Sequence, residues 1–95
     1  MAMDAADIWR KCFSQWPAEL ERRGVLVTSF GEQIAFEGFA TSDEMLLVER
    51  RAPDTVGART VILAYQAITA LKIVDVTKPK AFQSMGFSVP PSRKT

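Results

Sequence analysis

The sequence predicts a small, mainly β protein: an N-terminal helix followed by five antiparallel strands strongly bent into a small barrel. Three observations lead to this fold class. One amphipathic segment comes first, and five apolar-rich segments separated by short polar breaks follow within residues 24–76. The last two of these segments meet at residues 65–67 with neither Gly nor Pro between them. A chain that turns so tightly without a turn residue is typical of a strongly bent sheet, in which one helical turn joins the last two strands.

Composition indicates one small globular domain. A chain of 95 residues can bury a single core, and 47% hydrophobic with 24% charged residues is ordinary for such a chain. The formal net charge is +1, so binding to nucleic acid or membrane would need a local patch. One cysteine and no histidine exclude an intrachain disulfide, a zinc-binding thiol cluster and histidine catalysis. The acidic start lacks the features of a signal peptide and no apolar run could span a membrane, so a cytoplasmic location is expected.

The first element is expected to be a helix over residues 5–23. Trp9, Cys12, Phe13 and Trp16 recur at helical spacing, which places them on one face. Cys12 is therefore expected to be a core residue rather than a reactive thiol. Burying each of the large aromatic side chains stabilises the fold by roughly 2–3 kcal/mol. This face must then lie on the sheet or on a neighbouring chain.

A proline divides this helical segment. Trp16 precedes Pro17 and is pushed away from helical geometry, so the helix is expected to break or kink there. Residues 18–23 are expected to add a second helical turn, with Pro17 at its first position and Gly24 as a left-handed stop.

Five strands are expected after the helix, over residues 25–30, 33–41, 45–51, 59–64 and 68–74. In the second strand, Ile34, Phe36 and Gly38 alternate with residues of the opposite face, among them Phe39. Gly38 in mid-strand indicates a sharp bend or bulge of the kind that curls a small sheet. The whole domain is expected to cover residues 1–76.

A C-terminal extension over residues 77–95 differs in character from the strands. Its middle carries Phe82, Met85 and Phe87, which are expected to dock on the domain. The last eight residues are expected to be disordered.

Short motifs in the strand region match one family of small barrels. Gly38 lies where that family's second strand bends on a glycine, and Asp43 precedes an apolar third strand, as in its first signature. Residues 61–68 match the second signature in part, with residues 67–69 closest to a bacterial branch. Over residues 5–75 the chain resembles the Sm-like (Lsm) family, of the SH3-like type, including the bacterial RNA chaperones called Hfq. The resemblance implies a ring-shaped homo-oligomer that binds single-stranded RNA.

Two RNA-binding elements of that family are replaced in this sequence. Tyr65 and Gln66 stand where the family carries an Arg-Gly or Lys-His pair that binds RNA at the ring pore. Leu46 lies near the place of the Asn that reads uracil. The loop at residues 41–44 is also shorter than the family norm. The resemblance therefore supports the fold more strongly than it supports pore-type RNA binding.

The candidate RNA contacts lie in the turn after the second strand and in the joint before the last one. They are Thr41, Asp43, Tyr65 and Gln66. Aromatic and amide side chains can stack on bases and hydrogen-bond to them, as in single-strand binding proteins. The alternative is that Tyr65 is a buried residue of the joint and Gln66 its solvent-exposed neighbour.

Three arginines form a second candidate site. Arg50, Arg51 and Arg59 bracket the loop between the third and fourth strands and could bind phosphate. The alternative is that they are strand-end charges that protect sheet edges from aggregation. Residues 54–57 within this loop weakly resemble a nucleotide-binding loop, but they lack the glycine spacing and the lysine of a P-loop.

Catalysis is not expected. The acidic pairs at residues 43–44 and 19–21 are explained by exposure at a turn and on a helix surface. No nucleophile, base and oxyanion site assemble from the sequence, and no cofactor or metal is expected.

Two functions remain open. One is weak binding of single-stranded RNA through the barrel loops, and the other is a non-catalytic oligomeric scaffold or protein-interaction module that has lost the RNA site. Both predict a homo-oligomer, because the apolar strands at residues 61–63 and 71–74 are edges that invite pairing with another chain. No membrane partner is expected.

Overall fold

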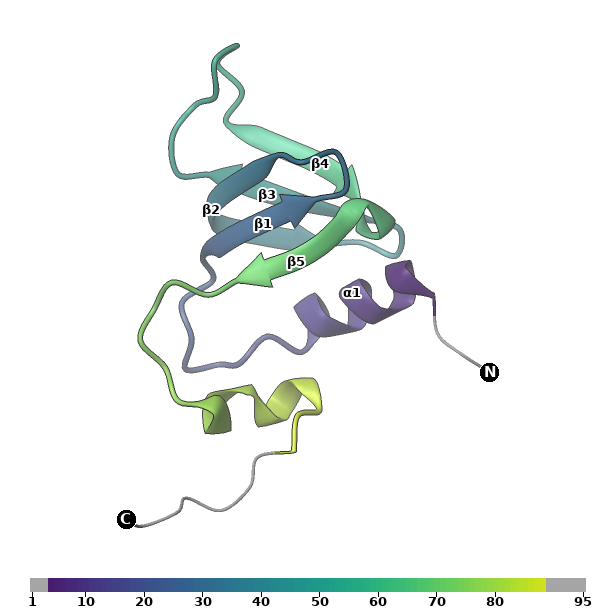
Figure 1. The fold of residues 1–95 in the computed structure, drawn as a ribbon, viewed down its shortest axis with the longest axis vertical. Helices are drawn as coiled ribbons and strands as arrows, with labels where there is room; N and C mark the ends of the chain where they lie inside the picture. Colours follow the sequence, from purple (N-terminus) through teal and green to yellow (C-terminus); the bar gives the residue numbers. More distant parts are fainter. Residues whose placement is uncertain (1–3, 89–95) are drawn as a thin grey trace.

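The computed structural model describes residues 4–88, which form a five-stranded antiparallel sheet with an N-terminal helix (Figure 1). The mainly β class is therefore confirmed. The elements in chain order are α1 (Ala5–Ser14), β1 (Gly24–Thr28), β2 (Gln33–Thr41), β3 (Met45–Arg50), β4 (Thr60–Ala64), the 3-10 turn η1 (Tyr65–Ala67), β5 (Ile68–Lys72) and the 3-10 helix η2 (Pro79–Met85).

The sheet curls strongly but is not closed. Its strand order is β4-β3-β2-β1-β5, so β4 and β5 are its two edges. In a flat sheet, four steps of about 4.8 Å would place these edges about 19 Å apart. Yet the joint between them, η1, has three residues, and a 3-10 helix rises only about 2 Å per residue. The sheet must therefore curl until its edges approach each other at this end, and the predicted one-turn joint is confirmed.

The bend predicted at Gly38 is confirmed by the strand register. The pairing of β2 with β3 shifts between Phe36 and Gly38, as at a β-bulge. The extra residue reverses which side chains point inward, because side chains alternate along a strand. Ile34 and Phe36 are buried before the bulge, and Phe39 is buried after it. The sequence expectation that Phe39 lies on the opposite face from Phe36 is therefore wrong.

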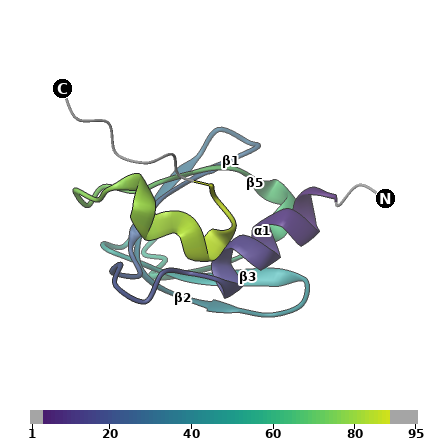
Figure 2. The ribbon, with the colours of Figure 1, turned by 90° about the horizontal axis from the view of Figure 1, so that it is seen from below.

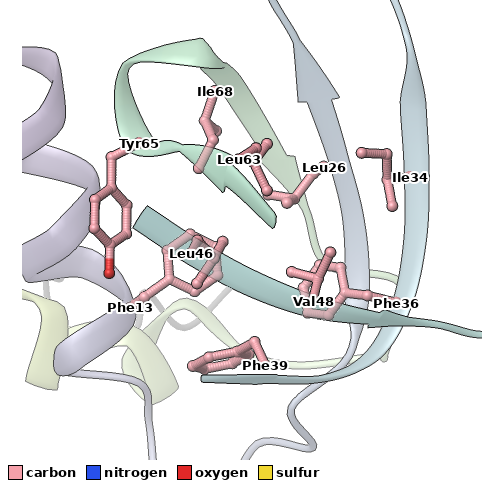
Figure 3. Close-up of a cluster of buried hydrophobic side chains, with 10 residues drawn as sticks. All are labelled: Phe13, Leu26, Ile34, Phe36, Phe39, Leu46, Val48, Leu63, Tyr65 and Ile68. Atoms are coloured by element: carbon pink, nitrogen blue, oxygen red, sulfur yellow. The ribbon is translucent and has the colours of Figure 1, made fainter. Parts of the chain in front are cut away.

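One hydrophobic core lies inside the curl of the sheet and beneath α1 (Figure 3). The helix, all five strands and the joint η1 each contribute buried members: Phe13, Leu26, Ile34, Phe36, Phe39, Leu46, Val48, Leu63, Tyr65 and Ile68. The core is thus shared by all the elements of the domain, which makes α1 part of the same cooperative unit.

The aromatic face of α1 packs on the sheet of its own chain. The helix starts at Asp4, whose carboxylate accepts a hydrogen bond from the Asp7 N–H at 2.9 Å. Phe13 is 2% exposed and meets the Phe39 ring edge-on, with 5.0 Å between the ring centroids. Trp16 stacks on Phe13 with 5.7 Å between centroids. Of the two alternatives for this face, packing on the sheet is the one observed.

The helix is shorter than expected. It ends at Ser14, and residues 15–23 contain turns and extended segments instead of a second helix. Proline disfavours helical geometry at Trp16, and only one turn follows, closed by the Leu20 N–H donating to the Pro17 carbonyl at 3.2 Å. The Trp16 indole N–H then donates to the Leu20 carbonyl at 3.2 Å. The predicted extension to residue 23 is wrong, and Gly24 begins β1 instead of ending a helix.

The strand bounds agree with the sequence except at some ends. β2 has the predicted limits, and β3 and β4 are each one residue shorter. β5 ends at Lys72, two residues earlier than expected, because its partner strand β1 begins at Gly24 and offers no further pairing.

The C-terminal extension lies beside α1 (Figure 2). Phe82 and Met85 are partly buried, as the predicted docking requires, whereas Phe87 is 61% exposed. Its helix η2 starts at Pro79 and ends at Gly86, whose φ of 97° is the left-handed conformation that glycine tolerates. The Ser84 hydroxyl donates to the Gln15 carbonyl at 3.1 Å and ties η2 to the end of α1. The predicted disorder concerns the last eight residues, 88–95, and all of these except Ser88 lie outside the described part of the chain.

Candidate nucleic-acid and assembly surfaces

The turn between β2 and β3 is built by Ser42. Its hydroxyl donates to the Met45 carbonyl at 2.9 Å and accepts the Met45 N–H at 3.0 Å. This side-chain bridge adds to the backbone hydrogen bond that the Ser42 N–H donates to the Met45 carbonyl at 3.0 Å. Thr41 and Asp43 are exposed on either side of Ser42, so both predicted RNA contacts in this turn are accessible to a ligand.

In the joint η1, the Gln66 side chain is exposed and the Tyr65 side chain is buried. Tyr65 is 0% exposed and its ring lies in the core (Figure 3). Its hydroxyl donates to the Ser42 carbonyl at 2.8 Å, so the joint and the turn lie together. Tyr65 has no ring face open to a base, and the stacking role predicted for it is wrong. The alternative, a buried joint residue beside an exposed Gln66, is confirmed.

A basic residue of α1 also reaches this end of the molecule. Burial raises the pKa of the Tyr65 hydroxyl, the nearby Asp43 carboxylate adds to the increase, and the Arg10 guanidinium opposes it. Arg10 is held by Asp7, with 3.0 Å between Nη2 and Oδ1, and remains partly exposed. Arg10 could not be identified from the sequence, because a basic residue on a helix surface carries no local signal of its place beside the joint.

The three arginines lie at the far end of β3. The Arg50 side chain turns inward: Nε donates to the Ala52 carbonyl at 3.0 Å, and Nη1 is buried with no hydrogen-bond partner among residues 4–88. Arg51 is exposed, with its Nε 3.6 Å from Glu37 Oε1. Arg59 is exposed at the start of β4. Arg51 and Arg59 are thus the accessible charges of this group.

The structure does not bring all the predicted contacts into one site. The Ser42 turn comes just before Met45, whereas the arginines begin at Arg50. Five steps along a strand at about 3.3 Å each separate the two groups by about 17 Å. A single nucleotide cannot contact both groups, although an extended strand of nucleic acid could pass from one to the other.

The loop before Arg59 is held by its own aspartate. The Asp54 carboxylate accepts the backbone N–H groups of Val56 and Ala58 at 2.9 and 2.8 Å. The Ala58 hydrogen bond is the main reason that the pKa of Asp54 lies below its ordinary value. This carboxylate therefore orders a turn, which supports the structural reading of residues 54–57 over a nucleotide-binding one.

The edge strand β4 carries an apolar surface. Ile62 is 60% exposed and Met45, beside it on β3, is 49% exposed. Between them and the Ser42 turn lies a groove of about 230 Å³, lined by Ala40, Thr41, Ser42, Met45, Leu47 and Ile62. Apolar side chains exposed beside an unpaired strand edge are typical of a protein–protein contact.

Across residues 4–88, no three His, Cys, Asp or Glu side chains gather as metal ligands. Within the same residues, no helix has the length and apolar character that crossing a membrane requires.

No family model, curated protein or solved structure matches this chain. The functional interpretation therefore depends on the geometry of the surfaces described above.

Proposed function

We propose that this protein is a non-catalytic, homo-oligomeric scaffold of the Sm-like small-barrel type, in which β4 of one subunit pairs with β5 of the next. The observation that carries the proposal is that both strands are sheet edges. Within the described residues, β4 pairs with β3 alone and β5 with β1 alone. Such edges present unpaired N–H and C=O groups to another chain.

The apolar groove beside β4 supports the same contact. Pairing two edge strands supplies hydrogen bonds, and burial of Met45 and Ile62 adds a hydrophobic contribution. A β4-to-β5 contact joins two different surfaces, so each subunit can bind one neighbour at each edge. Such contacts generate a ring if the rotation between subunits closes.

The order of the elements supports the small-barrel type. A helix, five antiparallel strands, a bulge at Gly38 and a one-turn joint follow one another as the family resemblance implies. The short joint draws the two edges of the sheet together at one end, as in a small barrel.

Light scattering after size exclusion tests the assembly. At micromolar concentration the protein is expected to have the mass of an oligomer. Ile62→Lys places a charge beside the β4 edge and is expected to reduce the mass to that of a folded monomer, because burying an unpaired charge is costly. Val56→Lys is the matched control, since Val56 is 87% exposed in the loop before β4 and should leave the mass unchanged.

A monomer mass for the unaltered protein would reject the proposal. A dimer would retain the pairing of edges but reject a ring. An oligomer that survives Ile62→Lys unchanged would place the contact elsewhere on the subunit.

Weak binding of single-stranded RNA is the second candidate function. The observation that favours it is the gathering of exposed Thr41, Asp43 and Gln66 with Arg10 at one end of the molecule. Burial of Tyr65 removes base stacking from this site, and the net charge of +1 implies few phosphate contacts. Binding should then depend on amide and hydroxyl contacts and vary little with salt.

Fluorescence anisotropy with U-rich and A-rich oligonucleotides tests RNA binding. Gln66→Ala is expected to weaken binding by about threefold to tenfold, as for the loss of one hydrogen bond. Tyr65→Phe should leave affinity unchanged, because the lost hydroxyl is buried against Ser42. Binding that survives Gln66→Ala but is lost in Arg51→Ala and Arg59→Ala would move the site to the arginines. Absence of binding at low salt would reject this function and leave the scaffold.

A further inference from the structure

A cavity of about 400 Å³, open to solvent, lies between α1, β5 and η2, and it shares no lining residue with the groove beside β4. Trp9 and Cys12 line it from α1, Leu71 from β5, and Phe82 and Met85 from η2. The wall formed by η2 is fixed at the end of α1 by the hydrogen bond from Ser84 to Gln15. Three separate segments of the chain therefore line one space that remains open to solvent.

The lining is almost wholly apolar. None of the side chains around the cavity is charged, and its polar side-chain groups are the Cys12 thiol, the Ser88 hydroxyl and the Trp9 indole N–H. Burial raises the pKa of the Cys12 thiol above its ordinary value, so the thiol stays neutral. Water against such a lining finds few hydrogen-bond partners, so its replacement by an apolar occupant is favourable.

The lining side chains remain incompletely buried. Trp9, Leu71, Phe82 and Met85 each keep intermediate exposure. An occupant of the cavity would remove this remaining apolar surface from water, which favours binding. The volume lies within the range of about 300–1,000 Å³ that is usual for small-molecule sites.

We propose that this cavity binds a small, neutral aromatic molecule. Trp9 and Phe82 offer ring faces and edges for offset or edge-to-face contacts with a bound ring, and Phe87 extends the aromatic lining. Met85 and Cys12 add sulfur atoms, which contact aromatic rings favourably. A charged ligand is disfavoured, because its charge would enter a space with no ionic partner.

Titration with N-phenyl-1-naphthylamine, a neutral aromatic probe that fluoresces in apolar sites, tests the proposal. Saturable binding of one probe per chain is expected, together with quenching of tryptophan emission, because Trp9 lines the cavity. Cys12→Trp fills the cavity and should weaken binding by roughly tenfold or more, as overpacking of a fitted site does. Phe30→Asp is the control, since Phe30 is 66% exposed in the turn after β1 and does not line the cavity.

A second variant protects the test against misfolding of Cys12→Trp. Phe87 is 61% exposed, so Phe87→Asp should leave the fold intact while introducing a charge beside the cavity. It too is expected to weaken probe binding, whereas Phe30→Asp should not. Absence of saturable binding, or equal affinity in both aspartate variants, would overturn the proposal.

The mass of the protein with saturating probe separates this inference from the assembly proposal. An unchanged mass is expected, because the cavity shares no lining residue with the β4 groove and Leu71 is its one lining residue from β5, the other assembly edge. Dissociation of an oligomer by the probe would mean that a second copy of the chain covers the cavity, and the small-molecule proposal would be rejected. The effect of Ile62→Lys on mass does not depend on either outcome.

Discussion

Phe13→Ala is expected to lower the free energy of unfolding by about 3–5 kcal/mol, the range typical of removing a buried phenylalanine. Phe13 is 2% exposed and contacts the Phe39 and Trp16 rings. It is also the buried residue through which α1 enters the core. A helix of ten residues is not stable alone in water, so loss of this contact should loosen the whole helix. Urea unfolding followed by circular dichroism at one fixed protein concentration measures the change.

Two further substitutions calibrate this result. Phe30→Ala removes the same side chain from a site that is 66% exposed, and it should change stability by less than about 0.5 kcal/mol. Trp9→Ala should fall between the two, because Trp9 is only partly buried beside the core. A loss below about 1 kcal/mol for Phe13→Ala would contradict the assigned packing. A folded monomer released from an oligomer would instead make α1 an interface element.

The strands and their joint could be predicted because their signals are local. The alternation of apolar side chains predicted the limits of β2 that the structure shows. The tight connection without Gly or Pro predicted the one-turn joint η1. The effect of the bulge on side-chain direction was missed. A glycine in mid-strand signals irregularity, but only the pairing with β3 shows that Phe39 joins Phe36 inside.

The end of the helix depends on contacts that no local pattern contains. Helical spacing continues through Trp16, and the residues after Pro17 are good helix formers, which made a second turn plausible. In the structure the Trp16 ring is held by Phe13 and Phe39, and its indole N–H donates to the Leu20 carbonyl. Tertiary packing thus overrides the local preference of this segment.

The candidate site was predictable only in part. The sequence left open whether Tyr65 faces a ligand or the core, because the deciding hydrogen bond is accepted by the Ser42 carbonyl, 23 positions earlier. The Tyr65 hydroxyl thereby ties the joint to the turn. The aromatic cavity could not be predicted from the sequence, since Cys12 lies in α1 and Phe82 lies in the C-terminal extension. Such a cavity has no signature in either segment alone.

Gly24→Ala is expected to lower the free energy of unfolding by about 1–3 kcal/mol, the usual effect of forcing extra atoms into a packed site. A Cβ at this position would lie 2.7 Å from the Lys72 carbonyl oxygen, closer than real Cβ atoms approach. The oxygen belongs to the backbone of β5, so it cannot swing away as a side chain would. Relief requires β5 to move from β1 where Val25 pairs with Lys72.

Gly38→Ala is the matched control for this prediction. A Cβ there would meet its nearest neighbour, Glu49 Oε1, at 3.5 Å, an ordinary contact with a side chain that can move. Alanine also reduces the freedom of the unfolded chain, so this variant should be neutral or up to about 1 kcal/mol more stable. Chemical unfolding of both variants measures whether each substitution lowers or raises the free energy of unfolding. Equal stability of the two variants would contradict the close approach of β1 and β5. Because β5 is also the proposed assembly edge, Gly24→Ala should weaken the oligomer as well, whereas Gly38→Ala should leave its mass unchanged.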